Sequence, residues 1–217
     1  VLNVLGRSDS LGIRGEWLEE WQQNLSSSFP GAFGDLARSW LSDMSCDKSC
    51  DKSFGDGFSK LRPNAIVGLS QLPVGVLPAS AAHAHIETSV RHLWGPLGMR
   101  TLPDFDPDYR PYYDQSSTEP STADGFNYHN GPEWLWPVGF LISAIQTWEI
   151  GEAGMAGHKT SDGTHSSEAS PSVKSREQWL RFIRRRMYAS SVLLRRGVWR
   201  SLPELPNKDA AFCPGSC

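Results

Sequence analysis

The amino-acid sequence predicts an all-helical fold with long loops between the helix ends. Five segments carry apolar residues at the three- and four-residue spacing of one helix face. No segment shows the alternation of apolar and polar residues that is typical of a half-buried strand. Many of the 15 Pro and 20 Gly residues lie between the helical segments, where they favour turns and loops.

The first predicted helix covers the residues around 13–25. The serine run before Pro30 is expected to end this helix. Its apolar side chains share one face, which comprises Ile13, Trp17, Leu18, Trp21 and Leu25. A second, short helix is expected over residues 34–43. Residues 45–60 are rich in turn formers and contain a near-repeat of Cys-Asp-Lys-Ser, which is typical of local low complexity.

Three further helices are expected along the rest of the chain. The first starts at Ser80 and ends at the Gly-Pro pair that begins at Gly95. The second starts at Pro137 and runs to about Ile150, because proline suits the first helical turn. The third is capped by Ser175 and ends at residue 197.

The segments between these helices are expected to be irregular. Residues 61–78 contain three prolines, so any regular element there is short. Residues 102–130 are predicted to form a long ordered loop, and such loops in compact domains are usually functional. Residues 151–175 hold almost no large apolar side chains, which predicts a disordered segment or a surface insertion. Residues 198–217 are predicted to form a loop.

Composition excludes several classes of protein. The net charge of −3 gives no signal for nucleic acid or an anionic membrane, and the longest apolar run is too short to span a bilayer. The composition also excludes collagen-like, coiled-coil and disulfide-scaffold proteins. Both ends of the chain resemble cut ends, so we expect a fragment of a longer protein. Four cysteines are ordinary for a reducing compartment.

The cysteine and histidine patterns predict no metal and no cofactor. Two cysteine pairs have three residues between their members, which is loose for a structural zinc site without a nearby histidine, so free thiols are favoured; the pairs are Cys46 with Cys50 and Cys213 with Cys217. Three histidines lie close together on one predicted helix but do not share one face, so exposed or half-buried histidines are favoured over a ligand triad; they are His83, His85 and His92.

One basic cluster stands out near the C-terminus. A solvated helix face is favoured for it over a nucleic-acid or membrane contact, because no interleaved aromatics or glycine-rich loop accompany the charges. Its members are Arg181, Arg184, Arg185, Arg186, Arg195 and Arg196. A basic-helix interaction module remains an alternative function.

Residues 124–137 mix hydrogen-bonding groups with flat aromatic faces. Sugars need this mixture, because their ring faces stack on indoles while their hydroxyls bind polar side chains. The residues concerned are Tyr128, His129, Glu133, Trp134 and Trp136. A Trp-rich turn that packs against the helix end is an equally good interpretation from the residues alone.

Glu204 lies in a stiff, apolar loop between Pro203 and Pro206. Partial desolvation of its carboxylate would tune it as an acid or base. From the residues alone this signal is weak, and a solvent-exposed loop glutamate is the favoured interpretation.

Four sequence blocks together resemble the C-terminal glucosidase region of eukaryotic glycogen debranching enzyme. They are LRPN at 61–64, LWGPLGMRTL at 93–102, DGFNYHNGPEWLWPVGF at 124–140 and WRSLPELPNKDAAFCPGSC at 199–217. The resemblance implies the C-terminal part of an (α/α)6 toroid of the six-hairpin glycosidase type, with long functional loops. It assigns residues 61–217 to this domain, with the insertion at 151–175, and leaves residues 1–60 as a poorly matched helical segment.

The resemblance also implies a chemistry. The family's glucosidase hydrolyses α-1,6-linked glucose stubs with inversion, and Glu204 matches its general base. The family's general acid lies in a Gly-Arg-Asp-Thr motif that these 217 residues lack, so the chain alone is expected to be inactive. The glucose pocket is expected to use His129, Glu133, Trp134 and Trp136 with Tyr128 of the same block, and Arg62 and Asn64 of LRPN.

The same resemblance implies partners and a location. The expected substrate is glycogen or limit dextrin with its branch stubs. The expected protein partner is the N-terminal portion of the same enzyme, which carries a 4-α-glucanotransferase, and no nucleic acid or membrane is expected. The expected location is the cytoplasm. A non-catalytic glycogen-binding remnant is an alternative function.

Overall fold

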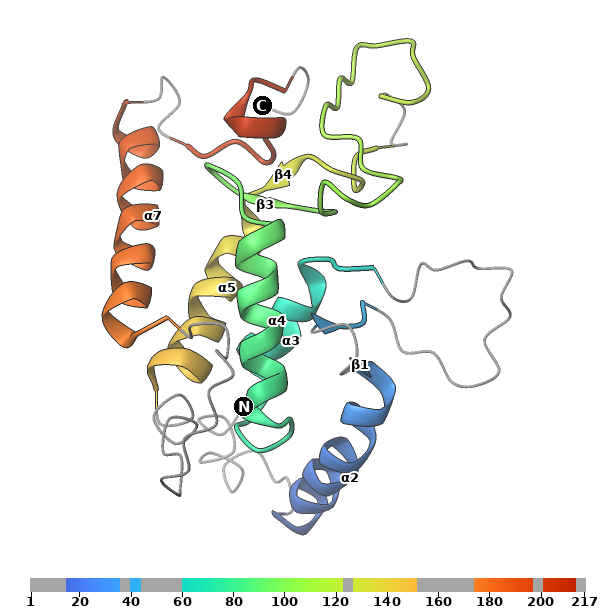
Figure 1. Cartoon of the computed structure of the whole chain (residues 1–217), viewed down its shortest axis with the longest axis vertical. Coiled ribbons are helices and arrows are strands. Elements are labelled where there is room, and N and C mark those ends of the chain that lie inside the picture. Colours follow the sequence, from blue (N-terminus) through green and yellow to red (C-terminus); the bar gives the residue numbers. More distant parts are fainter. Residues whose placement is uncertain are drawn as a thin grey trace, which may run out of the picture.

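A computed structural model describes residues 15–35, 40–43, 60–122, 127–151, 174–196 and 201–213. The described residues are mostly helical, which confirms the predicted class at that level (Figure 1). The larger helices are α2 (Gly15–Phe33), α3 (Asn64–Gln71), α4 (Ala79–His92), α5 (Trp136–Ile145) and α7 (Arg176–Arg196). Most of the low-complexity segment 45–60 and of the insertion 151–175 lies outside the described residues.

The N-terminal predictions need two corrections. Helix α2 does not end before Pro30 but continues to Phe33, and the Phe29 and Phe33 rings stack at 4.7 Å. The predicted helix over 34–43 is wrong, because β1 (Gly34–Asp35) and β2 (Trp40–Leu41) form an antiparallel pair there. The Leu41 backbone amide donates a 3.0 Å hydrogen bond to Nδ1 of His85. In a helix, this amide would instead donate to a backbone carbonyl four positions earlier.

His85 is therefore buried rather than exposed or half-buried. Its side chain is inaccessible to solvent, and burial lowers its pKa to about 3. Because Nδ1 accepts from Leu41, the neutral ring carries its proton on Nε2 and donates it to the Ser89 hydroxyl, 3.3 Å away. His83 and His92 are half-buried, as expected.

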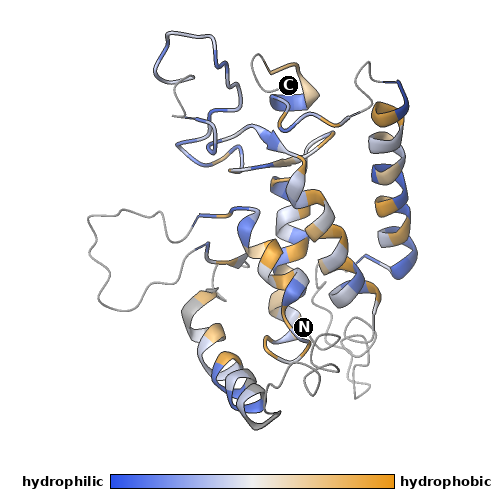
Figure 2. Cartoon of the chain, turned by 180° about the vertical axis from the view of Figure 1, so that it is seen from behind, coloured by the Kyte–Doolittle hydropathy of each residue, from blue (hydrophilic) through white to orange (hydrophobic). Residues whose placement is uncertain are grey.

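The main core lies where α3, α4 and α5 meet, and Figure 2 shows apolar residues concentrated there. The Trp148 indole donates to the Leu69 carbonyl at 2.9 Å, which ties the end of the α5 region to α3. A π-helical turn, η3 (Gln146–Ile150), continues α5, and the sequence pattern does not predict it. It places the consecutive side chains of Trp148 and Glu149 in the interior, where Glu149 bonds with His83 at 2.8 Å and accepts from the Trp179 indole at 3.0 Å.

Helix α7 begins and ends where the sequence predicts. The Ser175 hydroxyl accepts from the Gln178 backbone amide at 3.3 Å, and the Gln178 side chain accepts in return from the Ser175 amide. The prediction of a solvated basic face is wrong at Arg186. Its guanidinium is buried 3.7 Å from the centroid of the Trp94 ring and donates to the Gly95 carbonyl, and burial lowers its pKa to about 10.

Two short strands and the C-terminal segment lie beyond the end of α4 (Figure 1). Strand β3 (Met99–Arg100) pairs antiparallel with β4 (Glu133–Trp134), so that Met99 faces Trp134 and Arg100 faces Glu133. A short 3-10 turn, η4 (Lys208–Ala210), follows the Glu204 loop. Among the described helices, none combines the length and the apolar character that crossing a membrane requires.

Candidate functional site

Four segments that are distant in sequence converge around β3 and β4. They are the LRPN turn before α3, residues 101–113, the segment from residue 127 into α5, and the C-terminal loop 201–213. The convergence is held largely by backbone contacts. The Arg110 amide donates to the Asn130 carbonyl at 2.6 Å, and the Thr101 amide donates to the Pro132 carbonyl at 3.3 Å.

A cavity of about 300 Å³ lies between these segments. It is lined by Arg62, Pro63, Asn64, Thr101, His129, Trp134 and Trp136. Five of the eight predicted site residues therefore lie around one space, from two blocks that are more than 60 positions apart. Tyr128, Glu133 and Glu204 do not line it.

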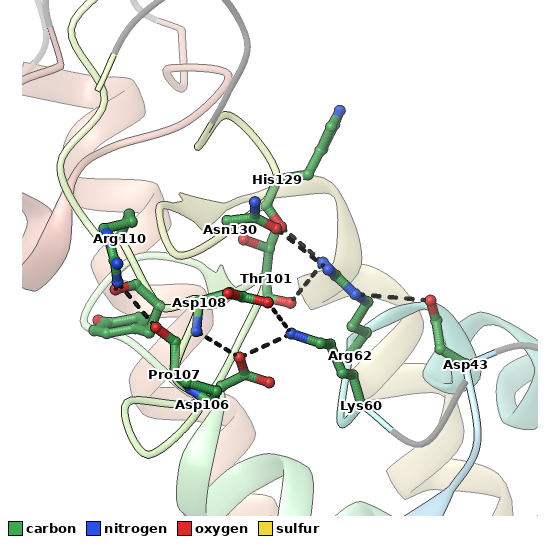
Figure 3. Close-up of polar contacts among 11 residues, drawn as sticks. Asp43, Lys60, Arg62, Thr101, Asp106, Pro107, Asp108, Arg110, His129 and Asn130 are labelled. Atoms are coloured by element: carbon green, nitrogen blue, oxygen red, sulfur yellow. Dashed lines mark hydrogen bonds and ion pairs between the residues drawn. The ribbon is translucent and has the colours of Figure 1, made fainter. Parts of the chain in front are cut away.

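Arg62 holds one wall of this cavity together (Figure 3). Its guanidinium donates to the His129 carbonyl at 2.7 Å, to the Asn130 side chain at 3.2 Å and to the Thr101 carbonyl at 3.3 Å. Its Nε lies 3.9 Å from the carboxylate of Asp43. Burial raises the pKa of Asp43, and the Asn64 hydrogen bond and the Arg62 charge oppose that rise. Arg62 thus directs its donors at the protein and shapes the wall.

Lys60 forms a second clamp beside Arg62, and no sequence pattern indicates it. Its ammonium group lies 2.9 Å from Asp106 and 2.6 Å from Asp108, so it fastens the start of the 102–122 loop (Figure 3). The two clamps lie two positions apart in the chain and hold different loops.

The aromatic wall is built from one short segment. The rings of His129 and Trp134 stack at 5.2 Å with an angle of 18° between their planes. The Tyr128 ring meets both edge-on, at 4.9 and 4.7 Å, and the Trp134 indole donates to the Tyr128 carbonyl at 3.1 Å. Trp136, at the first position of α5, is 47% exposed. The cavity therefore combines a flat aromatic surface with amide, hydroxyl and imidazole groups, which is the chemistry that a sugar ring requires.

Glu133 is buried behind this wall. Its Oε2 accepts the backbone amides of Gly98 at 3.1 Å and Leu97 at 3.2 Å. Its Oε1 is buried without a hydrogen-bond partner among the described residues. Burial raises the pKa of Glu133, and the amides of Gly98 and Leu97 and the Arg100 charge oppose that rise.

The loop that carries Glu204 runs beside β4. The Glu133 amide donates to the Pro206 carbonyl at 3.0 Å, and the Leu135 amide donates to the Glu204 carbonyl at 3.4 Å. The Glu204 side chain is exposed, and its carboxylate hydrogen-bonds with the Tyr128 hydroxyl. Burial raises the pKa of that hydroxyl and the contact with Glu204 raises it further, so Tyr128 keeps its proton and acts as the donor.

Asn207 anchors the same loop, although sequence reasoning does not select it. Its side chain accepts from the Tyr113 amide at 2.8 Å and donates to the Tyr113 and Phe212 carbonyls at 3.0 and 3.1 Å. Near it, Leu205 is buried against Tyr113 and Trp134. Asn207 lies in the LPELPN block, but nothing local distinguishes a buried anchoring asparagine from an ordinary turn asparagine.

Within the described ranges, no three His, Cys, Asp or Glu side chains are grouped so that they could hold a metal ion. Of the four cysteines, only Cys213 is described, and its buried thiol donates to the Tyr113 carbonyl at 3.3 Å.

Comparison with known proteins gives two findings. Residues 7–217 match the family described as amylo-alpha-1,6-glucosidase. The glycogen debranching enzyme of Saccharomyces cerevisiae is 33% identical over 159 residues, which is 72% of this chain and 10% of that protein. The chain thus spans about a tenth of the length of this relative.

Proposed function

Since this chain belongs to the amylo-alpha-1,6-glucosidase family, we propose that its cavity binds the α-1,6-linked glucose of a glycogen branch stub. The complete enzyme that contains the chain then hydrolyses that linkage with inversion. The same enzyme carries a 4-α-glucanotransferase in its N-terminal portion and acts in the cytoplasm on glycogen and limit dextrin. The chain contributes the C-terminal part of an (α/α)6 toroid.

The cavity between the LRPN turn and the aromatic wall is the observation that carries this proposal. Trp134 and Trp136 offer apolar surface, and Asn64, Thr101 and His129 add polar groups to the lining. A pyranose presents apolar ring faces and a rim of hydroxyls, so this arrangement suits it better than it suits an anion or an extended peptide.

Glu204 is the proposed general base. In an inverting glycosidase, one carboxylic acid protonates the leaving oxygen while a carboxylate on the opposite face of the sugar activates water, with about 6.5–9.5 Å between the two groups. Exposure leaves the Glu204 carboxylate accessible to water, and the Tyr128 hydroxyl fixes its orientation next to the aromatic wall. The general acid comes from a part of the enzyme outside this chain.

The test is a Glu204→Gln variant of the complete enzyme. Gln keeps the shape of the side chain but cannot accept the proton, so glucose release from limit dextrin should fall by roughly 10²–10⁴-fold. Glucan transfer, at a separate site, should persist. Asp209→Asn is the matched control, because it removes an exposed carboxylate from the same loop, and Asn tolerates the positive φ of 58° at that position.

Two outcomes would decide against the assignment. Glucose release within a few-fold of wild type in Glu204→Gln would exclude Glu204 as the base. An equal loss in Asp209→Asn would show that the loop responds to any change of charge and that Glu204 has no special role.

A further inference from the structure

Glu133 lies at the junction between the cavity wall and the loop that carries Glu204. We propose that Glu133 is a positioning residue, whose side chain fixes the turn 95–98 against β4 and thereby holds Trp134 and the Glu204 loop in register. The inference rests on the proposed function, because it assigns Glu133 a role toward the base at position 204.

The turn 95–98 is built around the Glu133 carboxylate. Oε2 accepts two successive backbone amides of this turn, from Leu97 and Gly98. A Cβ atom at position 95 would collide with the carboxylate itself, and one at position 98 would lie 2.5 Å from the Trp134 carbonyl oxygen. A side chain at position 98 would meet backbone, and one at position 95 would displace the carboxylate, so the turn closes tightly on Glu133.

A second side chain also fixes this turn. Arg186 of α7 donates to the Gly95 carbonyl and lies over the Trp94 ring. Arg100, which faces Glu133 across the β3–β4 pair, and Arg186 are the two cations that act on the carboxylate among the described residues. The backbone amide of Asp209 also faces the carboxylate, from the turn η4.

Strand β4 connects this turn to the cavity wall and to the Glu204 loop. Strand β4 pairs with β3, which directly follows the turn. The amides of Glu133 and of Leu135, the residue after β4, donate to the carbonyls of Pro206 and Glu204. Between them, Trp134 extends into the cavity wall. Loss of the Glu133 contacts would therefore release the turn and β4 together, and with them the base and the stacking surface.

The burial of Glu133 separates this role from a catalytic one. Its side chain is inaccessible to solvent, unlike that of Glu204, so it cannot touch the substrate or its attacking water. A positioning role needs an acceptor oxygen and the shape of the side chain, whereas acid–base chemistry needs the titrating carboxyl group. Gln supplies the first two and lacks the third.

The experiment compares Glu133→Gln and Glu133→Ala with Glu204→Gln in the complete enzyme. We expect Glu133→Gln to release glucose within about five-fold of wild type, because one amide oxygen can accept both backbone amides. We expect Glu133→Ala to lower kcat by about 10–100-fold, with an unchanged KM for glucan transfer at the separate site. Ile86→Ala, a truncation in the core of α4, is the control for destabilisation and should leave kcat near wild type below its unfolding temperature.

Gly95→Ala tests the same contact without removing the carboxylate, and it keeps the proposal testable if Glu133→Ala does not fold. The added methyl group collides with the carboxylate, so kcat should fall as in Glu133→Ala. A Glu133→Gln enzyme as inactive as Glu204→Gln would overturn the proposal in favour of acid–base chemistry at position 133. Full kcat in Glu133→Ala or in Gly95→Ala would overturn it as well. Full activity of Glu204→Gln would instead overturn the assignment of Glu204 as the base in the proposed function, whatever the position 133 variants do.

Discussion

The Arg62 guanidinium donates a 2.7 Å hydrogen bond to the backbone carbonyl of His129, across 67 positions of the chain. This bond joins the two sequence blocks that line the cavity. Arg62, a residue that is expected to bind sugar, therefore directs its hydrogen bonds at the protein and fixes the cavity wall.

Replacement of Arg62 by Lys should weaken the site although it keeps the charge. A lysine cannot reproduce the planar fork that contacts His129, Asn130 and Thr101 together. Hydrogen bonds to charged groups contribute about 1.5–3 kcal/mol, so kcat/KM for glucose release should fall by roughly 10–100-fold. Arg195→Lys, an exposed arginine in the last turn of α7, should change little. Equal kcat/KM values for the two variants would contradict the clamp.

Truncation of Trp136 should impair binding of the stub more than its cleavage. Aromatic stacking contributes about 0.5–1.5 kcal/mol, so Trp136→Ala should raise KM for glucose release by roughly 2–10-fold with kcat nearly unchanged. Trp21→Ala is a close control, since both indoles are 47% exposed but Trp21 lies on α2, away from the cavity. If Trp21→Ala raised KM equally, the cavity would not be the glucose site.

Acidification should destabilise the chain through His85. The pKa of His85 is about 3 in the folded protein, whereas that of an exposed histidine is 6.5, so between these values the unfolded chain binds more protons. The free energy of unfolding should therefore fall as pH drops from 6.5 toward 3, by at most about 1.4 kcal/mol per pH unit from this group.

Urea-induced unfolding at several pH values, followed by tryptophan fluorescence, measures this dependence. His85→Gln should lack the His85 contribution to the slope, whatever its stability at neutral pH. His92→Gln should retain it. An identical slope in wild type and His85→Gln would show that His85 titrates normally in the folded protein.

Local patterns predict those parts of the fold in which neighbouring residues decide the structure. Periodicity and end signals locate α4 and α7, including the Ser175 cap, because helix faces and caps depend on residues within a few positions. The helix expected over 34–43 does not form, because a distant residue decides the structure there. Leu41 takes its conformation from a contact with His85, 44 positions away.

The same distinction applies to the candidate site. Residue chemistry selects the aromatic block and Glu204, and of these His129, Trp134 and Trp136 line the cavity. Arg62 and Asn64, which also line it, are indicated by the family resemblance alone. Sequence reasoning cannot separate Glu133 from its neighbours, because its burial depends on Gly95, Leu97 and Gly98, which lie more than 30 positions earlier. The burial of Arg186 is missed for the same reason, since its partner Trp94 lies far away in the chain.

The contacts of the C-terminal loop also bear on the order of folding. Asn207 and Cys213 bond to Tyr113 across 94 and 100 positions. The stretch of chain between Tyr113 and Asn207 contains α5 and α7. Closure of so long a segment costs conformational entropy before its contacts form, and such contacts slow folding. Helices α3, α4 and α5 precede the loop bearing Glu204 in the chain and are synthesised before it. Docking of that loop brings Glu204 against Tyr128, so a nascent chain stalled before residue 204 would hold all seven cavity-lining residues but lack the proposed base.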